Sequence, residues 1–129
     1  MGYQLDTDVI IYHLRGQKQL NPNWLNKDTA ISVITLGELL YGAQKSNQVN
    51  KSISIVKSFL DDFNLKVIPL DSKLIESYSH HKAKLEKAGN KLDDFDLLIG
   101  ITAKENNLIL ATNNHTHFQR INGLKLDKQ

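Results

Sequence analysis

The chain has 129 residues, a length that suits one domain with one hydrophobic core, so we expect residues 1–129 to form a single domain. Its 40% hydrophobic and 23% charged residues exclude a disordered chain, and the absence of Cys excludes disulfides and thiolate metal sites. The net charge of +2 permits a polyanionic partner such as RNA but does not demand one.

The start of the chain and its longest apolar runs argue against export and membrane insertion. The first residues lack a basic run followed by a long apolar stretch, so no signal peptide is expected. The apolar runs at 9–12 and 108–111 fall far short of the ~20 residues that a membrane span needs. We therefore expect a cytoplasmic protein.

Short apolar runs alternate along the chain with longer amphipathic stretches. The apolar runs predict strands at 3–5, 30–34, 66–70, 108–112 and, as the weakest, 124–126. The stretches between them predict helices at 8–14, from 35 to about 42, and at 50–63, 72–87 and 94–106. Strands separated by helices predict an α/β fold of three layers, αβα, with a central parallel sheet of four to five strands.

In open parallel sheets, ligands gather beyond the carboxyl ends of the strands. Asp6, Asp71 and the pair Asn113–Asn114 follow the first, third and fourth predicted strands. Asp6 is the strongest candidate, because a carboxylate at the end of a central strand is costly to bury without a cation or hydrogen-bond partners. Asp8, two residues later, is interpreted as the cap of the following helix.

Two further carboxylates, Glu38 and Asp96, are candidates for the same functional site. Glu38 lies three residues after Thr35, a spacing that fits a helix capping box as well as a functional site. Asp96 precedes the apolar run Leu97–Ile99, so it belongs to a mostly buried helix, where a carboxylate needs a partner. Three carboxylates at converging element ends would suit a hard cation such as Mg²⁺ or Mn²⁺.

The histidines and lysines are weaker candidates. We interpret His115 and His117 as exposed loop residues and the pair His80–His81 as facing solvent. Lys82 begins a series of lysines that indicates a solvated helix face, although phosphate binding would use the same residues.

Four sequence blocks, in order, resemble the PIN-domain ribonucleases, and specifically the VapC-type toxins of bacterial toxin–antitoxin pairs. LDTDVII at 5–11 is similar to the family's L-D-T-N-V-L-I, with Asp8 in place of the common Asn. ISVITLGELLYGA at 31–43 resembles the segment with the second acidic residue, and DFDLLIG at 94–100 resembles D-x-L-I-A. LATNNHTHFQRINGL at 110–124 is similar to the closing T-N-N-x-x-x-F-x-R-I-x-G-L.

The resemblance implies a parallel sheet flanked by helices, an Mg²⁺- or Mn²⁺-dependent endoribonuclease, a VapB-like antitoxin as partner, and a homodimer. Carried over by position, Asp6, Glu38 and Asp96 would hold the metal, which would activate a water to attack an RNA phosphodiester. Asn114 stands where many members have a fourth carboxylate, and it would orient a metal-bound water or a phosphate oxygen.

Three alternatives remain at this point. Asp6-Thr7-Asp8 resembles the D-x-D pair of haloacid-dehalogenase-like phosphatases, which would make Asp8 as essential as Asp6. A non-enzymatic receiver-type signalling domain would use Asp71 as its phosphoacceptor. A PIN fold without activity would serve only as a binding partner, although it would have little reason to keep all three carboxylates.

Overall fold

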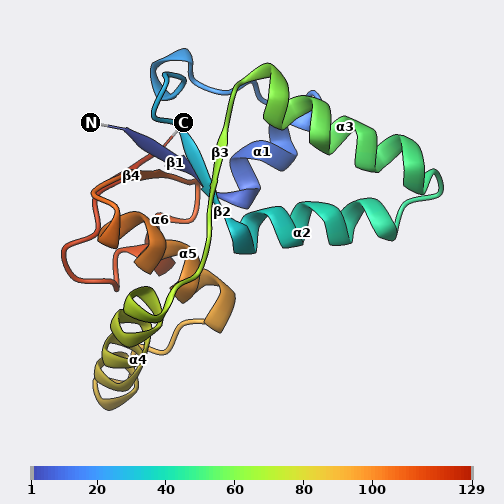
Figure 1. Cartoon of the computed structure of the whole chain (residues 1–129). Coiled ribbons are helices and arrows are strands. Elements are labelled where there is room, and N and C mark those ends of the chain that lie inside the picture. Colours follow the sequence, from blue (N-terminus) through green and yellow to red (C-terminus); the bar gives the residue numbers. More distant parts are fainter. Residues whose placement is uncertain (1, 129) are drawn as a thin grey trace.

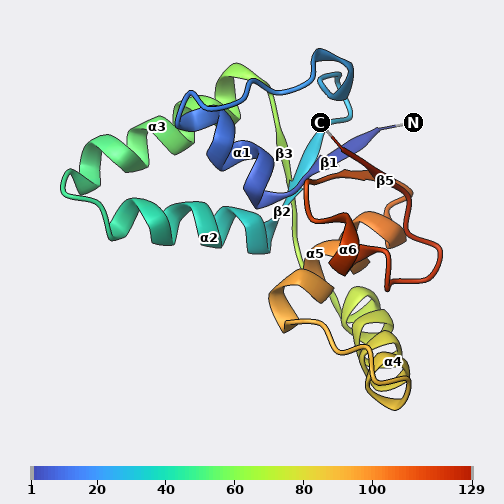
Figure 2. The same cartoon turned by 180° about the vertical axis from the view of Figure 1, so that it is seen from behind.

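The computed structural model describes residues 2–128 and contains a wholly parallel sheet with helices on both faces (Figures 1 and 2). The strands are β1 (Tyr3–Leu5), β2 (Ala30–Ser32), β3 (Lys66–Ile68), β4 (Ile109–Ala111) and β5 (Leu126–Asp127). Their order across the sheet is β3-β2-β1-β4-β5. The predicted three-layer αβα fold with a central parallel sheet is confirmed.

The helices divide into two groups, one on each side of the sheet (Figures 1 and 2). One group is α1 (Thr7–Leu14), α2 (Val33–Gln44) and α3 (Val49–Asp62). The other is α4 (Ser72–Lys87), α5 (Asp94–Glu105) and α6 (His115–Phe118). The sequence did not predict the single turn α6 or the 3₁₀ helix η1 (Pro22–Trp24). No helix in residues 2–128 combines the length and the apolar character that crossing a bilayer requires.

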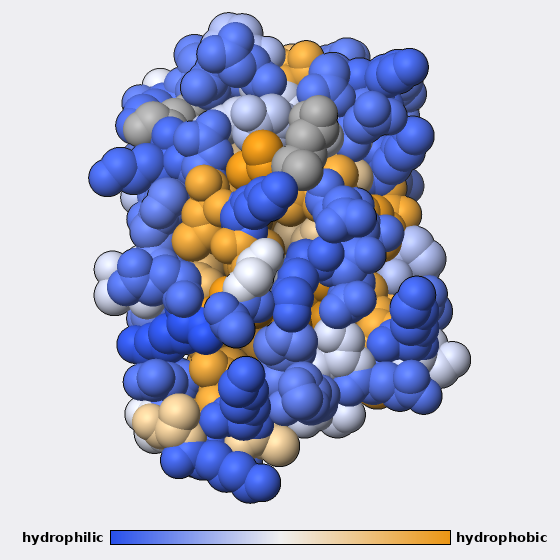
Figure 3. Space-filling model, turned by 90° about the vertical axis from the view of Figure 1, so that its left-hand side faces the viewer, coloured by the Kyte–Doolittle hydropathy of each residue, from blue (hydrophilic) through white to orange (hydrophobic). Residues whose placement is uncertain are grey.

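Each face of the sheet has its own hydrophobic cluster. Leu5 and Ile31 point to the α1–α3 side, where they pack with Val9 and Phe59. Leu110 belongs to the opposite cluster, with Ile99 and the other buried residues of α4–α6. Successive residues of a strand point to opposite faces, so Leu110 and Ala111 give β4 an apolar side chain on each side. In β1 the buried Gln4 instead donates its side-chain amide to the Ile99 carbonyl of α5 at 2.9 Å. On the face shown in Figure 3, hydrophilic residues predominate around a central band of hydrophobic surface.

The start of α2 differs from the prediction in a way that changes the interpretation of Glu38. The Ser32 hydroxyl accepts a hydrogen bond from the Ile34 N–H at 3.0 Å, so the helix begins at Val33 and β2 ends two residues earlier than expected. This cap outweighs the β preference of Val33 and Ile34. Thr35 is then a fully buried residue of the first turn and cannot be the cap. The capping-box alternative for Glu38 is therefore wrong.

The strand order reverses between β1 and β4, and this reversal places the site. From β1 the chain moves outward through β2 to β3, and it then returns to β4 on the other side of β1. The carboxyl ends of β1 and β4 thus meet at the topological switch point, where open α/β sheets bind ligands. Asp71 follows the edge strand β3 and caps α4 by accepting the Leu74 N–H at 2.8 Å. Its place in the fold gives it a structural role.

Trp24 and Asp127 tie the short strand β5 to the rest of the molecule. The Trp24 side chain is fully buried, and its indole N–H donates to Asp127 Oδ2 at 2.9 Å. The Asp127 carbonyl oxygen accepts the N–H of Thr112, the residue after β4, at 3.0 Å. The last strand thereby supports the sheet end at which the candidate site lies.

Replacing Trp24 with Phe keeps an aromatic ring in the core and removes the donor to Asp127. We expect Trp24→Phe to lower the free energy of unfolding by about 1–3 kcal/mol, because a partly buried carboxylate loses a partner and some packing is lost. Urea denaturation followed by circular dichroism measures the change. Asp127→Asn, which retains an acceptor oxygen, is the matched control and should cost less; equal losses in both variants would contradict a role for the indole donor.

Candidate active site

Asp6 is a buried carboxylate at the carboxyl end of β1, with an exposed fraction of 6%. Its backbone N–H donates to the Ala111 carbonyl of β4 at 3.0 Å, which fixes the residue between the two strands. Asp6 Oδ1 accepts the Thr7 N–H at 2.8 Å, and Oδ2 accepts the Thr112 hydroxyl at 2.7 Å. Asp6, not Asp8, is therefore the N-cap of α1, which corrects the sequence interpretation of Asp8.

Asp8 lies in the first turn of α1 and faces the loop after β4. Its Oδ2 accepts the Asn113 N–H at 3.2 Å. Its Oδ1 is buried and has no hydrogen-bond partner among the described residues. Asp8 thus belongs to the same cluster as Asp6, although local sequence reasoning treated it only as a cap.

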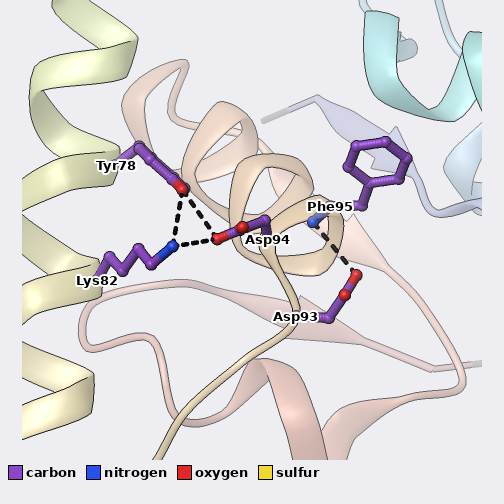
Figure 4. Close-up of polar contacts among 5 residues, drawn as sticks. All are labelled: Tyr78, Lys82, Asp93, Asp94 and Phe95. Atoms are coloured by element: carbon purple, nitrogen blue, oxygen red, sulfur yellow. Dashed lines mark hydrogen bonds and ion pairs between the residues drawn. The ribbon is translucent and has the colours of Figure 1, made fainter.

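Asp96 is a half-buried residue in the first turn of α5, and the prediction that this helix is mostly buried is confirmed by Leu97 and Ile99. Asp93 caps this helix by accepting the Phe95 N–H at 3.3 Å. The Asp94 carboxylate points the other way, toward α4, as Figure 4 shows. The three neighbouring aspartates therefore have three different surroundings.

A cluster of Tyr78, Lys82 and Asp94 joins α4 to the first turn of α5 (Figure 4). Asp94 Oδ1 accepts the Lys82 ammonium and the Tyr78 hydroxyl, each at 2.8 Å. These bonds lower the pKa of Asp94, which keeps its carboxylate charged. The sequence predicted a solvated helix face for Lys82. The structure corrects this, because Lys82 forms an ion pair with Asp94.

Glu38 is half-buried on α2 and is held by the residue that follows Asp6. Thr7 donates its hydroxyl to Glu38 Oε1 at 2.6 Å, and the hydroxyl oxygens of Thr7 and Thr35 lie 3.0 Å apart. Thr7 therefore links α1 to α2 at the site. Local sequence reasoning gave no role to Thr7, because a hydroxyl that contacts a residue 31 positions away leaves no local pattern.

Asn114 lies after β4, where its backbone N–H donates to the Thr112 hydroxyl at 2.9 Å. Its side-chain amide is 2.8 Å from His117 Nδ1 on α6. His117 is exposed, as expected, but it lies on a helical turn and near enough to Asp96 for its charge to favour the ionised form of that carboxylate.

The other two histidine predictions need correction. His115 was predicted to be exposed, but it is half-buried. His81 was predicted to face solvent, but it is largely buried, and its Nε2 lies 2.9 Å from Lys104 Nζ on α5. Only His80 of the adjacent pair faces solvent. The helical period places residues 80 and 81 about 100° apart, so two neighbours can face different surroundings.

The carboxylates at this sheet end oppose one another electrostatically. Desolvation, followed by the negative charge of Asp8, raises the pKa of Asp6 to about 7. Burial also raises the pKa of Asp8, and burial together with the charges of Asp93 and Asp8 raises the pKa of Asp96. A positive charge in the cluster would favour the ionised form of all three groups.

The residues present fit a hard divalent cation. The side chains offer carboxylate oxygens, one of them buried without a partner, and such oxygens are the ligands that Mg²⁺ and Mn²⁺ prefer. Within residues 2–128, no three acidic or histidine side chains are already close enough together to enclose a metal ion. The structure brings Asp6, Asp8 and Asp96 into electrostatic contact and connects Glu38 to them through Thr7.

Comparison with known proteins agrees with this geometry. The PIN domain family model matches residues 3–124. Ribonuclease VapC2 of Rickettsia felis is 34% identical over 132 residues, and Ribonuclease VapC2 of Haemophilus influenzae is 30% identical over 130; each alignment covers 98% of this chain and 97% of the relative. The tRNA(fMet)-specific endonuclease VapC of Salmonella typhimurium is 29% identical with the same coverage.

Solved structures show the same similarity in three dimensions. The VapBC2 crystal structure from Rickettsia felis, bound to a DNA fragment from its promoter, contains a chain with a TM-score of 0.90 and 33% identity, covering 100% of this chain and 99% of that one. DNA-bound VapBC from Salmonella typhimurium also gives a TM-score of 0.90, at 27% identity and 99% and 98% coverage. With its parallel sheet, its acidic cluster at the switch point and this match over nearly its whole length, the chain belongs to the PIN domain family.

Proposed function

We propose that this protein is a metal-dependent endoribonuclease that acts as the toxin of a toxin–antitoxin pair. The observation that carries the proposal is the acidic cluster of Asp6, Asp8 and Asp96 at the sheet switch point, in a chain similar along its length to proteins named ribonuclease. Asp6, Glu38 and Asp96 would hold Mg²⁺ or Mn²⁺. When bound, the cation supplies Lewis acidity and neutralises charge on the scissile phosphate.

The chain's own residues would orient the reacting groups. Thr112 and the Thr7 N–H hold the Asp6 carboxylate in one rotamer, and the Thr7 hydroxyl holds Glu38. Asn114 would orient a water or a phosphate oxygen through its amide, beside His117. Because Asn114 is neutral, its contribution is positional, and it adds no charge that would attract a second cation.

Glu38 lines a groove of about 690 Å³, which we assign to single-stranded RNA. Tyr41 and Phe95 line it and are 63% and 51% exposed, so each could offer a ring face for base stacking. One face of the Tyr41 ring is already covered by Lys45, whose Nζ lies 4.9 Å from the ring centroid. Arg15 and Lys45 line the same groove and would contact phosphates. Figure 4 shows the Phe95 ring pointing away from the Lys82–Asp94 pair.

The partner and the assembly follow from the relatives. Solved relatives are VapBC complexes, which supports a VapB-like antitoxin as the partner of this chain. We further propose that residues 1–129 form one domain and that the protein is a homodimer, and a cytoplasmic location stays a prediction from the sequence. The phosphatase and receiver alternatives lose their support, since the PIN domain match covers residues 3–124 and Asp71 is a helix cap.

Removing the metal or one carboxylate should abolish RNA cleavage. We expect EDTA to stop cleavage, Mg²⁺ or Mn²⁺ to restore it, and Asp96→Asn to lower the rate by about 100-fold or more because a metal ligand is lost. The cleavage assay uses two RNA samples. One is initiator tRNA, chosen because a relative is named a tRNA(fMet)-specific endonuclease, and the other is total RNA, in which the new 5′ ends are mapped. Asp62→Asn, an exposed site on α3, is the charge-matched control. Undiminished cleavage by Asp96→Asn would overturn the site assignment.

The metal-free protein should lose stability as the pH rises. Folded Asp6 has a pKa of about 7 against an ordinary value of 3.8, so between these values the folded state binds a proton that the unfolded state has released. We expect Asp6→Asn to be more stable than the wild type by about 2 to 4 kcal/mol at pH 8, with little difference at pH 4. Urea denaturation in EDTA at both pH values measures this, and a difference independent of pH would contradict it. Added Mg²⁺ should reduce or reverse the difference in the free energy of unfolding between Asp6→Asn and the wild type at pH 8.

Thr7 should be necessary for positioning Glu38. Thr7→Val keeps the side-chain shape and removes the donor, so we expect about a 10-fold or greater loss in metal affinity and cleavage rate, as for other residues that orient metal ligands. Thr7→Ser retains the hydroxyl and should stay within a few-fold of the wild type. Equal activity of the Val and Ser variants would show that the 2.6 Å hydrogen bond to Glu38 has no functional role.

A further inference from the structure

We infer that Asp8 is a fourth carboxylate of the metal site, which acts directly on the cation through its buried Oδ1. This inference rests on the proposed metal-dependent nuclease function and deepens it. The metal ligands proposed above are Asp6, Glu38 and Asp96, and Asp8 entered there only as a neighbouring charge.

The two oxygens of Asp8 have different surroundings. Oδ2 accepts the Asn113 N–H at 3.2 Å, which ties α1 to the turn after β4. Oδ1 is buried and accepts no hydrogen bond from any described residue. Leaving a buried polar atom unsatisfied destabilises the folded state, and more so when the group is charged, so holding one backbone N–H would not by itself explain a carboxylate here.

An uncharged side chain would serve the structural role at lower cost. Asn in this position could accept the Asn113 N–H with its own oxygen, and it would place no second negative charge beside Asp6. The carboxylate instead puts a second negative charge in the first turn of the helix that Asp6 caps, facing the same turn after β4. The unsatisfied oxygen and the repulsion are both relieved by the same event, the binding of a cation.

The chemistry of the neighbourhood selects the kind of cation. Asp6, Asp8 and Asp96 present oxygen atoms, the chain has no Cys, and His117 is the imidazole whose charge reaches Asp96. Such a set suits a hard divalent ion such as Mg²⁺ or Mn²⁺ rather than a thiophilic one. Asp8 would also supply the anionic charge that Asn114, as a neutral amide, does not provide.

Mn²⁺ binding to the full chain tests this without depending on activity. Isothermal titration with MnCl₂, at a pH of about 8, compares the wild type with Asp8→Asn and Asp8→Ala. We expect both variants to bind Mn²⁺ at least about 10-fold more weakly, because the Asn variant keeps the acceptor for Asn113 but loses the anionic oxygen. Circular dichroism checks that both remain folded.

Two controls separate the possible outcomes. Asp62→Asn removes one negative charge from an exposed position on α3 and should leave Mn²⁺ affinity unchanged, whereas a loss as large as that of Asp8→Asn would reduce the effect of Asp8 to general electrostatics and overturn the inference. If Asp8→Asn binds Mn²⁺ with wild-type affinity while Asp8→Ala binds weakly, Asp8 has a structural role, and the inference is overturned as well.

Asp6→Asn tests the proposed site itself. If Asp6→Asn loses Mn²⁺ while Asp8→Asn retains it, the proposed site stands without Asp8; if both retain it, the site and the role of Asp8 fail together.

Discussion

The burial of the Asp6 carboxylate at the end of a central strand is the constraint on which the rest of the site depends. A charge that is only 6% exposed is stable only if its oxygens are satisfied or neutralised. The protein satisfies one oxygen with the Thr7 N–H of α1 and the other with the Thr112 hydroxyl beyond β4. These two bonds bring a helix start and a loop together at the switch point of the sheet, and Thr112 is in turn supported by β5 through the carbonyl of Asp127.

The remaining carboxylates reach the same place by way of helices. Asp8 and Asp96 lie in the first turns of α1 and α5, where the partial positive charge of the helix end opposes part of their mutual repulsion. Glu38 lies in the second turn of α2, where the Thr7 hydroxyl holds its carboxylate. The hydrogen bonds of the folded chain therefore orient these carboxylates but do not neutralise them. That leaves a cluster whose negative charge is best compensated by a divalent cation.

The Tyr78–Lys82–Asp94 cluster shows that acidic residues next to one another in the sequence need not share a function. Asp94 is committed to the ion pair with Lys82 that holds α4 against α5, and Asp93 caps the helix. Asp96 lies two residues after Asp94, about 200° further round the helix axis, and its pKa is affected by Asp8 and His117. Of the three aspartates it is therefore the candidate for the site. The same division occurs on α1, where Asp6 is both cap and candidate ligand, while Asp8 has one oxygen bonded and one free of partners among the described residues.

The sequence by itself determined the fold class and most element positions, and it made Asp6 and Asp96 candidates for the site, because hydrophobic periodicity and the cost of burying a charge are local signals. The family blocks added Glu38 and Asn114. Only the tertiary structure decided the contacts and roles that depend on residues far apart in the sequence. It showed that Ser32 rather than Thr35 caps α2, that Thr7 holds Glu38, and that Asp8 faces Asn113 across 105 positions of sequence. Hydrogen bonds between remote residues leave no periodic trace, so only the folded chain could show which carboxylates are satisfied and which still need a partner.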